Sequence, residues 1–331
     1  MELTMVAQTV YVKRRIPSRI AFLLTFVIGL TTPQLKNWDQ KGSGTATNTP
    51  GNELPSGEID PTRPFEFLID ADEFDWNGYT IAKEIRKHHE IIPEPNTPHY
   101  QTLDIAYIVL KRSGKLIRKF DANVIGEMGQ SANFGFYSFL GPGSRQLFIS
   151  QDTNRGGCQW VVSRPPELRV IFDGHKFGVG REGADLRVED IDRDGTVEII
   201  VPLTDFYDFQ DKMSISEIPL PEIIFKFDAK QNEYLPANPS FKSYLKTDPL
   251  KAFYATKDDE LSYRSATLNA MTFLIYRGER EQAWQMFDHY YRLPDKGEMQ
   301  LRIKAILKDQ PVYNLIYNNV ISSSQTKTCR S

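Results

Sequence analysis

The chain has 331 residues, enough for one large domain or two ordinary ones. Its hydrophobic fraction of 40%, charged fraction of 25% and aromatic fraction of 12% are globular values and exclude a disordered chain. A formal net charge of −3 without a polybasic signature argues against nucleic acid as a partner. The two cysteines, Cys158 and Cys329, exclude a disulfide-dense scaffold but permit one bridge, which the sequence leaves open.

Residues 1–33 predict a signal peptide or an N-terminal anchor. Lys13, Arg14, Arg15 and Arg19 precede the apolar run IAFLLTFVIGL at residues 20–30, and a basic segment before a short apolar segment is typical of an exported chain. Eleven residues of helix rise only about 16 Å, less than the roughly 30 Å hydrocarbon core of a bilayer. No A-x-A cleavage motif follows, so cleavage and a retained membrane tether both stay open. The predicted location is secreted, periplasmic or in the cell envelope.

The next two segments differ in composition and in the spacing of their apolar residues. Residues 34–64 predict a flexible linker, because Gly, Ser, Thr, Pro and Asn dominate them. In residues 65–247, short apolar runs with turn residues between them predict antiparallel strands. TLDIAYIVLKR and KLIRKFDA flank Ser113-Gly114, which predicts a two-residue hairpin turn. The runs that follow are GFYSFL, RQLFISQD, CQWVVSR, LRVIFDG, DLRVED, VEIIVPL and EIIFKFD.

Residues 248–321 predict a helical subdomain, because their apolar residues recur at helical spacing. Arg277-Gly278-Glu279 predicts the break of a helical hairpin, and a third helix is expected after Pro294. Residues 322–331 form a polar tail. The predicted fold class is therefore α+β, mainly β: an antiparallel meander, either partly propeller-like or a sandwich, followed by a helical hairpin subdomain.

The stretch DLRVEDIDRDGTVEIIV, residues 185–201, predicts a metal-binding loop. Hard cations such as Ca²⁺ take six to eight oxygen ligands, and Gly195 permits the sharp turn on which carboxylates can converge. Helix–loop–helix calcium sites carry a glutamate at position 12, but here that position is Val201, inside an apolar run. We therefore expect strands on both sides of the loop and an acidic residue at position 9, Glu198, to complete the ligand shell. The alternative is a solvated acidic hairpin turn, in which each close carboxylate pair would cost about 1–4 kcal/mol.

The pattern strand, D-x-D-x-D-G-x-x-E, strand resembles the FG-GAP or VCBS type of repeat, the calcium-binding blades of integrin-like β-propellers. The resemblance implies that the ion is held by four side chains and one backbone carbonyl, those of Asp190, Asp192, Asp194 and Glu198, and of Thr196. A complete propeller repeats its motif every 40–60 residues or so, and this chain has one good copy. The nearest second candidate, EFDWNGYTI at residues 73–81, would have an incomplete ligand shell.

The function predicted from these patterns is that of an exported, calcium-stabilised, non-catalytic interaction module. Its partner would be a protein or a glycan that the sequence does not name. The alternative is an exported hydrolase of glycan or peptide in which calcium is structural, and a third possibility is an envelope protein tethered by its N-terminus. No histidine pair with zinc spacing and no nucleophile motif occurs in the sequence, so no catalytic residue is predicted.

Overall fold

The computed structural model describes residues 72–92, 99–122, 130–153, 156–163, 167–179, 186–209, 211–246, 248–255 and 260–318. These residues all belong to one unit of the chain, residues 57–331. The predicted signal or anchor segment, the linker and the polar tail lie outside the described residues. None of the helices in the described ranges is both long enough and apolar enough to span a membrane.

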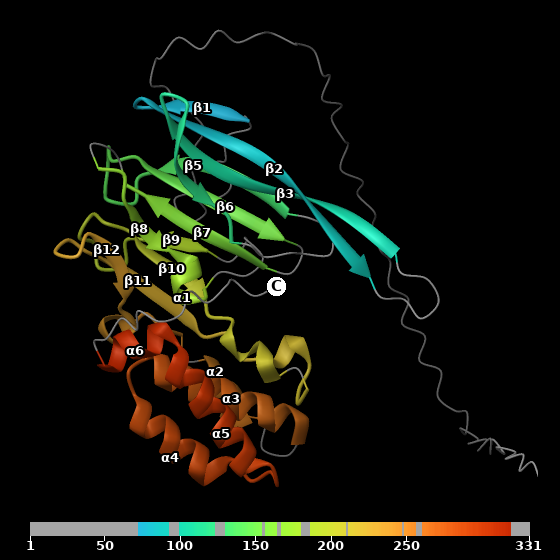
Figure 1. Cartoon of the computed structure of the whole chain (residues 1–331). Helices are drawn as coiled ribbons and strands as arrows, with labels where there is room; N and C mark the ends of the chain where they lie inside the picture. The colour runs from blue at the N-terminus through green and yellow to red at the C-terminus, as the bar shows by residue number, and fades with distance from the viewer. Residues whose placement is uncertain are drawn as a thin grey trace, which may run out of the picture. The chain divides into compact units, whose positions relative to one another are not determined.

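The larger of the two sheets has eight strands in the order β1-β2-β3-β5-β6-β7-β8, with β4 paired to β3 (Figure 1). A single parallel bridge between Ile105 and Gln130 joins its two four-stranded halves, and the other pairings are antiparallel. The strands are β1 (Glu73–Trp76), β2 (Tyr79–Ile92), β3 (His99–Arg112), β4 (Lys115–Phe120), β5 (Gln130–Tyr137), β6 (Gln146–Thr153), β7 (Gly156–Val162) and β8 (Val170–Asp173).

Two tight hairpins in this sheet follow from residues that tolerate a positive φ. Ser113 and Gly114, with φ of 49° and 75°, connect β3 to β4, which confirms the predicted turn. Asn77 and Gly78, with φ of 52° and 81°, connect β1 to β2 in the same way. The segment EFDWNGYTI is therefore a plain hairpin, in which the Thr80 hydroxyl donates to Asp75.

The smaller sheet has four antiparallel strands in the order β12-β11-β10-β9. Its strands are β9 (Arg187–Glu189), β10 (Glu198–Pro202), β11 (Glu222–Asp228) and β12 (Glu233–Pro236). A short helix, α1 (Gly174–Phe177), precedes β9 along the chain. One face of the small sheet carries Val201, Ile223 and Phe225 into the main core, whereas Ile200 and Ile224 on the other face pack against Phe241.

The C-terminal region is helical, as predicted, but it has more helices than the hairpin and third helix that the sequence indicated. The helices are α2 (Asp248–Ala255), α3 (Glu260–Tyr276), α4 (Arg280–Tyr290), α5 (Lys296–Asp309) and α6 (Pro311–Asn318). The break between α3 and α4 is a Schellman motif: the Gly278 N–H donates to Ile275 and the Glu279 N–H to Leu274. Gly278 has a φ of +89°, which only glycine adopts without strain.

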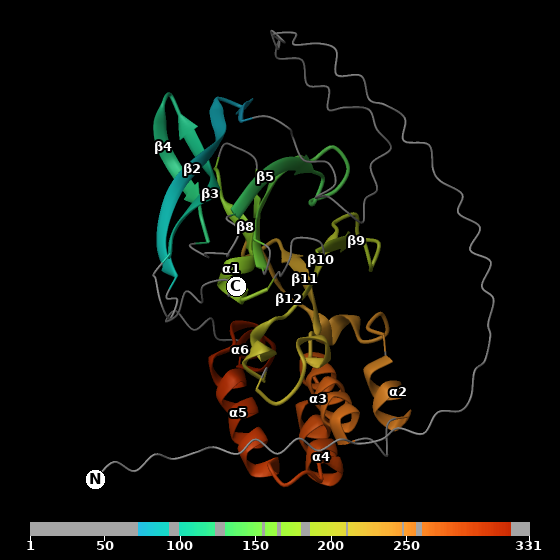
Figure 2. The same cartoon turned by 90° about the vertical axis from the view of Figure 1, so that its right-hand side faces the viewer.

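One hydrophobic core joins the two sheets and the helices. It contains Phe148 and Phe172 of the large sheet, Phe225 of the small sheet, and helical residues such as Met271 and Phe287, all of them fully buried. Figures 1 and 2 both show the small sheet lying between the large sheet and the helices. The helices are therefore part of the same folded core as the strands.

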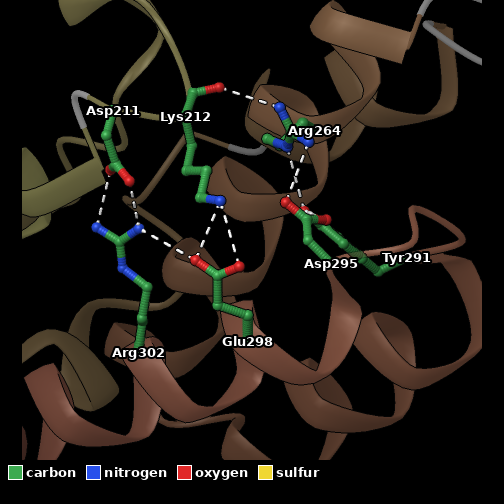
Figure 3. Close-up of polar contacts among 7 residues, drawn as sticks. All are labelled: Asp211, Lys212, Arg264, Tyr291, Asp295, Glu298 and Arg302. Atoms are coloured by element: carbon green, nitrogen blue, oxygen red, sulfur yellow. Dashed lines mark hydrogen bonds and ion pairs between the residues drawn. The ribbon is translucent and has the colours of Figure 1, made fainter.

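Polar contacts also tie the helices to the loop that follows the small sheet's β10 (Figure 3). Arg264 of α3 donates to the Lys212 carbonyl at 3.0 Å and to Asp295 at 3.1 Å. Arg302 of α5 makes a two-pronged ion pair with Asp211, with both N···O distances at 2.9 Å. The fold class predicted from the sequence, α+β and mainly β with a helical C-terminal region, is confirmed, and the described strands close no barrel.

Candidate metal centre

The acidic loop lies between β9 and β10, so strands flank it on both sides as the sequence predicts. Two residues turn the chain: Gly195 has a φ of +89° and Arg193 a φ of +62°. The loop is closed internally by its own carboxylates. Asp190 accepts a hydrogen bond from the Gly195 N–H at 3.1 Å, and Asp194 accepts one from the Thr196 N–H at 2.9 Å. These bonds curl the loop so that its acidic side chains face one point.

The three aspartates converge. Asp190, Asp192 and Asp194 each offer a carboxylate oxygen, and these oxygens lie within 4.8 Å of one another. Oxygens that share one calcium ion, at roughly 2.4 Å from its centre, lie at most about 4.8 Å apart. The spacing therefore fits a single coordination sphere, and an all-oxygen donor set is the one that hard cations prefer.

Glu198, the fourth predicted side-chain ligand, is not part of this cluster of three, and its side chain is fully buried, with an exposure of 0%. Its Oε2 accepts the Ile191 N–H at 2.8 Å, while Oε1 is buried and has no hydrogen-bond partner within the described residues. Burial raises the pKa of Glu198 above its ordinary value, although the Ile191 hydrogen bond acts in the opposite direction. A buried carboxylate oxygen that accepts no hydrogen bond costs free energy, and a nearby cation reduces that cost.

The sequence reasoning missed Lys226 of β11, whose ammonium group lies among these carboxylates. It forms ion pairs with Asp192, with Asp194 at 2.6 Å and with Glu198 Oε1 at 3.5 Å. Burial opposes its charge, but the hydrogen bonds to Asp192 and Asp194 outweigh burial and raise the pKa of Lys226. The same ammonium lowers the pKa of Asp194. The ammonium group thus contacts two of the three clustered aspartates and also Glu198.

The sequence carried only part of the signal for Lys226, the alternation of its strand, and the strand pairing comes from the structure. EIIFKFD alternates, and β10 pairs with β11 through Ile199 and Phe225, so the next register position sets Glu198 opposite Lys226. The Lys226 side chain thus belongs to the sheet face that carries the buried residues Ile200 and Ile224. A lysine at such an inward position needs an acidic partner.

The loop is held against the large sheet. A Cβ on Gly141, in the turn between β5 and β6, would lie 2.8 Å from the Gly195 carbonyl oxygen. The buried Tyr234 hydroxyl is within hydrogen-bond distance of the Phe139 carbonyl, at 3.1 Å, and of the Val197 carbonyl, at 2.9 Å. The acidic loop therefore lies at the junction of the two sheets, so a change in the conformation of the loop should affect how the sheets pack.

The structure thus brings together some of the five predicted metal ligands, but not all of them. Asp190, Asp192 and Asp194 cluster, whereas Glu198 lies outside that cluster and shares the Lys226 ammonium with Asp192 and Asp194. Thr196 lies in the loop and donates its N–H to Asp194; the use of its carbonyl as a ligand stays a prediction.

Two other groups outside the loop bear on function. Cys158 lies fully buried in β7 and is disulfide-bonded; Cys329, the chain's other cysteine, lies outside the described residues. Asp152 of β6 accepts the Ser150 hydroxyl at 2.6 Å through Oδ2, while its Oδ1 is buried without a partner among the described residues. Burial raises the pKa of Asp152, and the Ser150 hydrogen bond offsets only part of that effect.

No family model matches the chain, and neither the curated proteins nor the solved structures contain a significant match to it. The resemblance of residues 185–201 to the FG-GAP or VCBS repeat therefore stays a prediction.

Proposed function

We propose that the chain is an exported interaction module in which a calcium ion, bound by the 190–198 loop, stabilises the junction of the two sheets. The observation that carries the proposal is the convergence of three aspartate oxygens within 4.8 Å of one another, near the fully buried carboxylate of Glu198. Once Lys226 has left the loop, the three aspartates carry three negative charges, which favours a divalent cation over another amine.

Export is supported by two independent features. The basic and apolar segment at the N-terminus is typical of secreted chains, and Cys158 is disulfide-bonded. Disulfides persist in oxidising compartments and are rare in reducing ones. Extracytoplasmic calcium is also abundant enough to fill the weak sites of extracellular modules, whose dissociation constants are roughly 10⁻⁴–10⁻³ M.

Calcium and Lys226 cannot occupy the loop together. A divalent ion about 4 Å from an ammonium group is repelled by about 8 kcal/mol at an effective dielectric constant of about 20. Binding of the ion therefore requires the ammonium group to move away, and its side chain, already 30% exposed, has a route to solvent. The loop then keeps its acidic ligands and exchanges one cation for another.

An edge strand supports a protein as the partner. Within the described residues β4 pairs with β3 alone, and Leu116 and Ile117 on β4 are 55% and 48% exposed. An open strand edge with apolar side chains is a common surface for pairing with another chain.

The test is thermal unfolding of metal-free protein with and without calcium. At 1 mM calcium and a dissociation constant of about 10⁻⁴ M, binding stabilises the fold by about 1.4 kcal/mol. That corresponds to a rise in Tm of roughly 3–5 °C for a fold of this size, and magnesium should give less. Asp192→Asn should abolish the rise, whereas Asp288→Asn, an equal charge change on an exposed part of α4, should leave it intact. Identical melting curves with and without calcium would show that the loop is only a turn.

The second candidate function, an exported hydrolase of glycan or peptide, is favoured by one observation, Asp152. Burial raises the pKa of Asp152, one of its oxygens has no hydrogen-bond partner among the described residues, and a raised carboxyl pKa is a feature of general acids. Hydrolysis of a chromogenic glycoside or peptide that Asp152→Asn abolishes, in protein that stays fully folded at the assay pH, would favour this function. Hydrolysis that survives the substitution would remove Asp152 from it.

A further inference from the structure

The position of Lys226 bears on how the loop is regulated. In the described structure its ammonium group contacts Asp192, Asp194 and Glu198, three of the residues proposed to bind the metal. We infer that Lys226 is an internal competitor of calcium: it neutralises the loop when calcium is absent, and calcium binds only by displacing it into solvent. This inference rests on the proposed calcium function and adds a mechanism that sets the affinity.

Three observations outside the aspartate cluster indicate that the loop and its surroundings form a binding site for a positive charge. Lys226 comes from a different strand than the loop, so the loop does not create its own counter-ion. Oε1 of Glu198 is buried, accepts no hydrogen bond from the described residues and forms an ion pair with the ammonium at 3.5 Å. The Lys226 ammonium also lies 5.9 Å from the centre of the Phe241 ring, which supports the side chain from the side of the small core cluster.

Ion exchange has a consequence that simple binding lacks. A loop with no internal cation is destabilised by the repulsion of its carboxylates until calcium arrives, and such a region folds only with its metal. A loop with Lys226 keeps its fold without calcium and binds calcium more weakly, because the ammonium contacts must first be broken. The chain would then respond at the higher calcium concentrations found outside cells and ignore lower ones.

The first experiment measures calcium affinity by calorimetric titration of the full, chelator-treated chain and of two variants. Lys226→Met keeps the apolar stem and removes the competing charge, so it should bind calcium at least tenfold more tightly, equivalent to about 1.4 kcal/mol. Lys242→Met is the matched control, because it removes the same charge from a lysine whose ammonium pairs with Glu279 at 3.4 Å. Its calcium affinity should stay within about twofold of the parent, since long-range charge effects are screened by salt.

The second experiment measures displacement directly. Amine-reactive ester labelling, followed by peptide mass spectrometry, should modify Lys226 slowly in metal-free protein and several-fold faster in 1 mM calcium. Lys242 serves as the internal reference, and its labelling rate should not depend on calcium.

Each outcome has one reading. Tighter binding by Lys226→Met together with faster labelling in calcium supports exchange. Equal affinities and unchanged labelling would overturn exchange and leave the calcium proposal standing. Binding by Lys226→Met alone would mean that the lysine holds the position permanently, which overturns both exchange and calcium binding by the natural chain. Absence of binding in all three proteins would overturn the proposed function, and this inference with it.

Discussion

Gln310 offers the sharpest test of whether the helices and the sheets form one folded unit. This residue lies between α5 and α6 and is fully buried. Its side-chain amide donates to the Phe177 carbonyl at 3.1 Å and to Asp205, and its oxygen accepts the N–H of Val312. One side chain therefore caps the first turn of α6 and bonds it to α1 and to the segment after β10.

Gln310→Leu keeps the approximate volume and removes the hydrogen bonds. It leaves a carbonyl and an N–H buried without this partner, and each such group costs about 1–3 kcal/mol. Taking about 3 kcal/mol in all, and about 3 °C for each kcal/mol in a fold of this size, we expect Tm to fall by roughly 9 °C. Gln310→Glu should be at least as harmful, because it brings a second carboxyl group next to Asp205.

The assay is urea unfolding followed by circular dichroism and by tryptophan fluorescence, with Gln285→Leu as the control. Gln285 is an exposed glutamine on α4, so the same substitution there should change the unfolding free energy by no more than about 0.5 kcal/mol. Both probes should report one shared transition that moves to lower urea in Gln310→Leu. If Gln310→Leu matches the control, or if the helical signal alone shifts, then Gln310 does not couple the helices to the sheets and the reasoning is wrong.

Two further predictions concern charge. Arg264→Met should lower the unfolding free energy by about 2–3 kcal/mol, because Arg264 and Asp295 are mostly buried and Arg264 also donates a hydrogen bond to the Lys212 carbonyl. Arg302→Met should lower it by only about 0–1 kcal/mol, since the ion pair of Arg302 with Asp211 is exposed. Denaturant titration measures the loss of unfolding free energy in both variants. Equal losses in the two would contradict this prediction. For Asp152 the folded-state pKa is raised, so the native state holds its proton at a pH where the unfolded chain has released it, and stability is lost as pH rises above the ordinary carboxyl range. Asp152→Asn should flatten that part of the stability profile measured by melting at several pH values, and an unchanged slope would assign the dependence to another group.

Local sequence patterns predicted the strands well where one short-range rule decides the conformation. EIIFKFD is β11 from end to end, and Ser113-Gly114 is a turn because both residues adopt a positive φ. The strand predicted over GFYSFL was wrong at its end. Strand β5 stops at Tyr137, and the Ser138 hydroxyl donates a hydrogen bond to the Ser144 carbonyl within a turn. The apolar residues after Tyr137 still enter the core, so their hydrophobicity did not distinguish strand from buried turn.

Contacts between distant segments were beyond the reach of local patterns. The aspartates of the acidic loop are neighbours in sequence, and their spacing alone predicted their convergence. Lys226 is 32 residues from Asp194, and only the pairing of β10 with β11 brings it there. The burial of Gln310 depends on Phe177, 133 residues earlier in the chain. A polar residue between two helices gave no local signal that three separate segments meet at its side chain.

The single core also determines when the chain can fold. Val312 of α6 is fully buried in the same cluster as Phe148 and Phe172, so the packing of the large sheet is incomplete until nearly the whole chain has been synthesised. Contacts of such long sequence separation form slowly, since a long loop must close before they stabilise anything. At synthesis rates of about 5–20 residues per second, the N-terminal half waits about 10 seconds or more for its C-terminal partner. A nascent chain that stays unfolded for this long can still be threaded through a membrane pore, so late folding fits the export proposed for this protein.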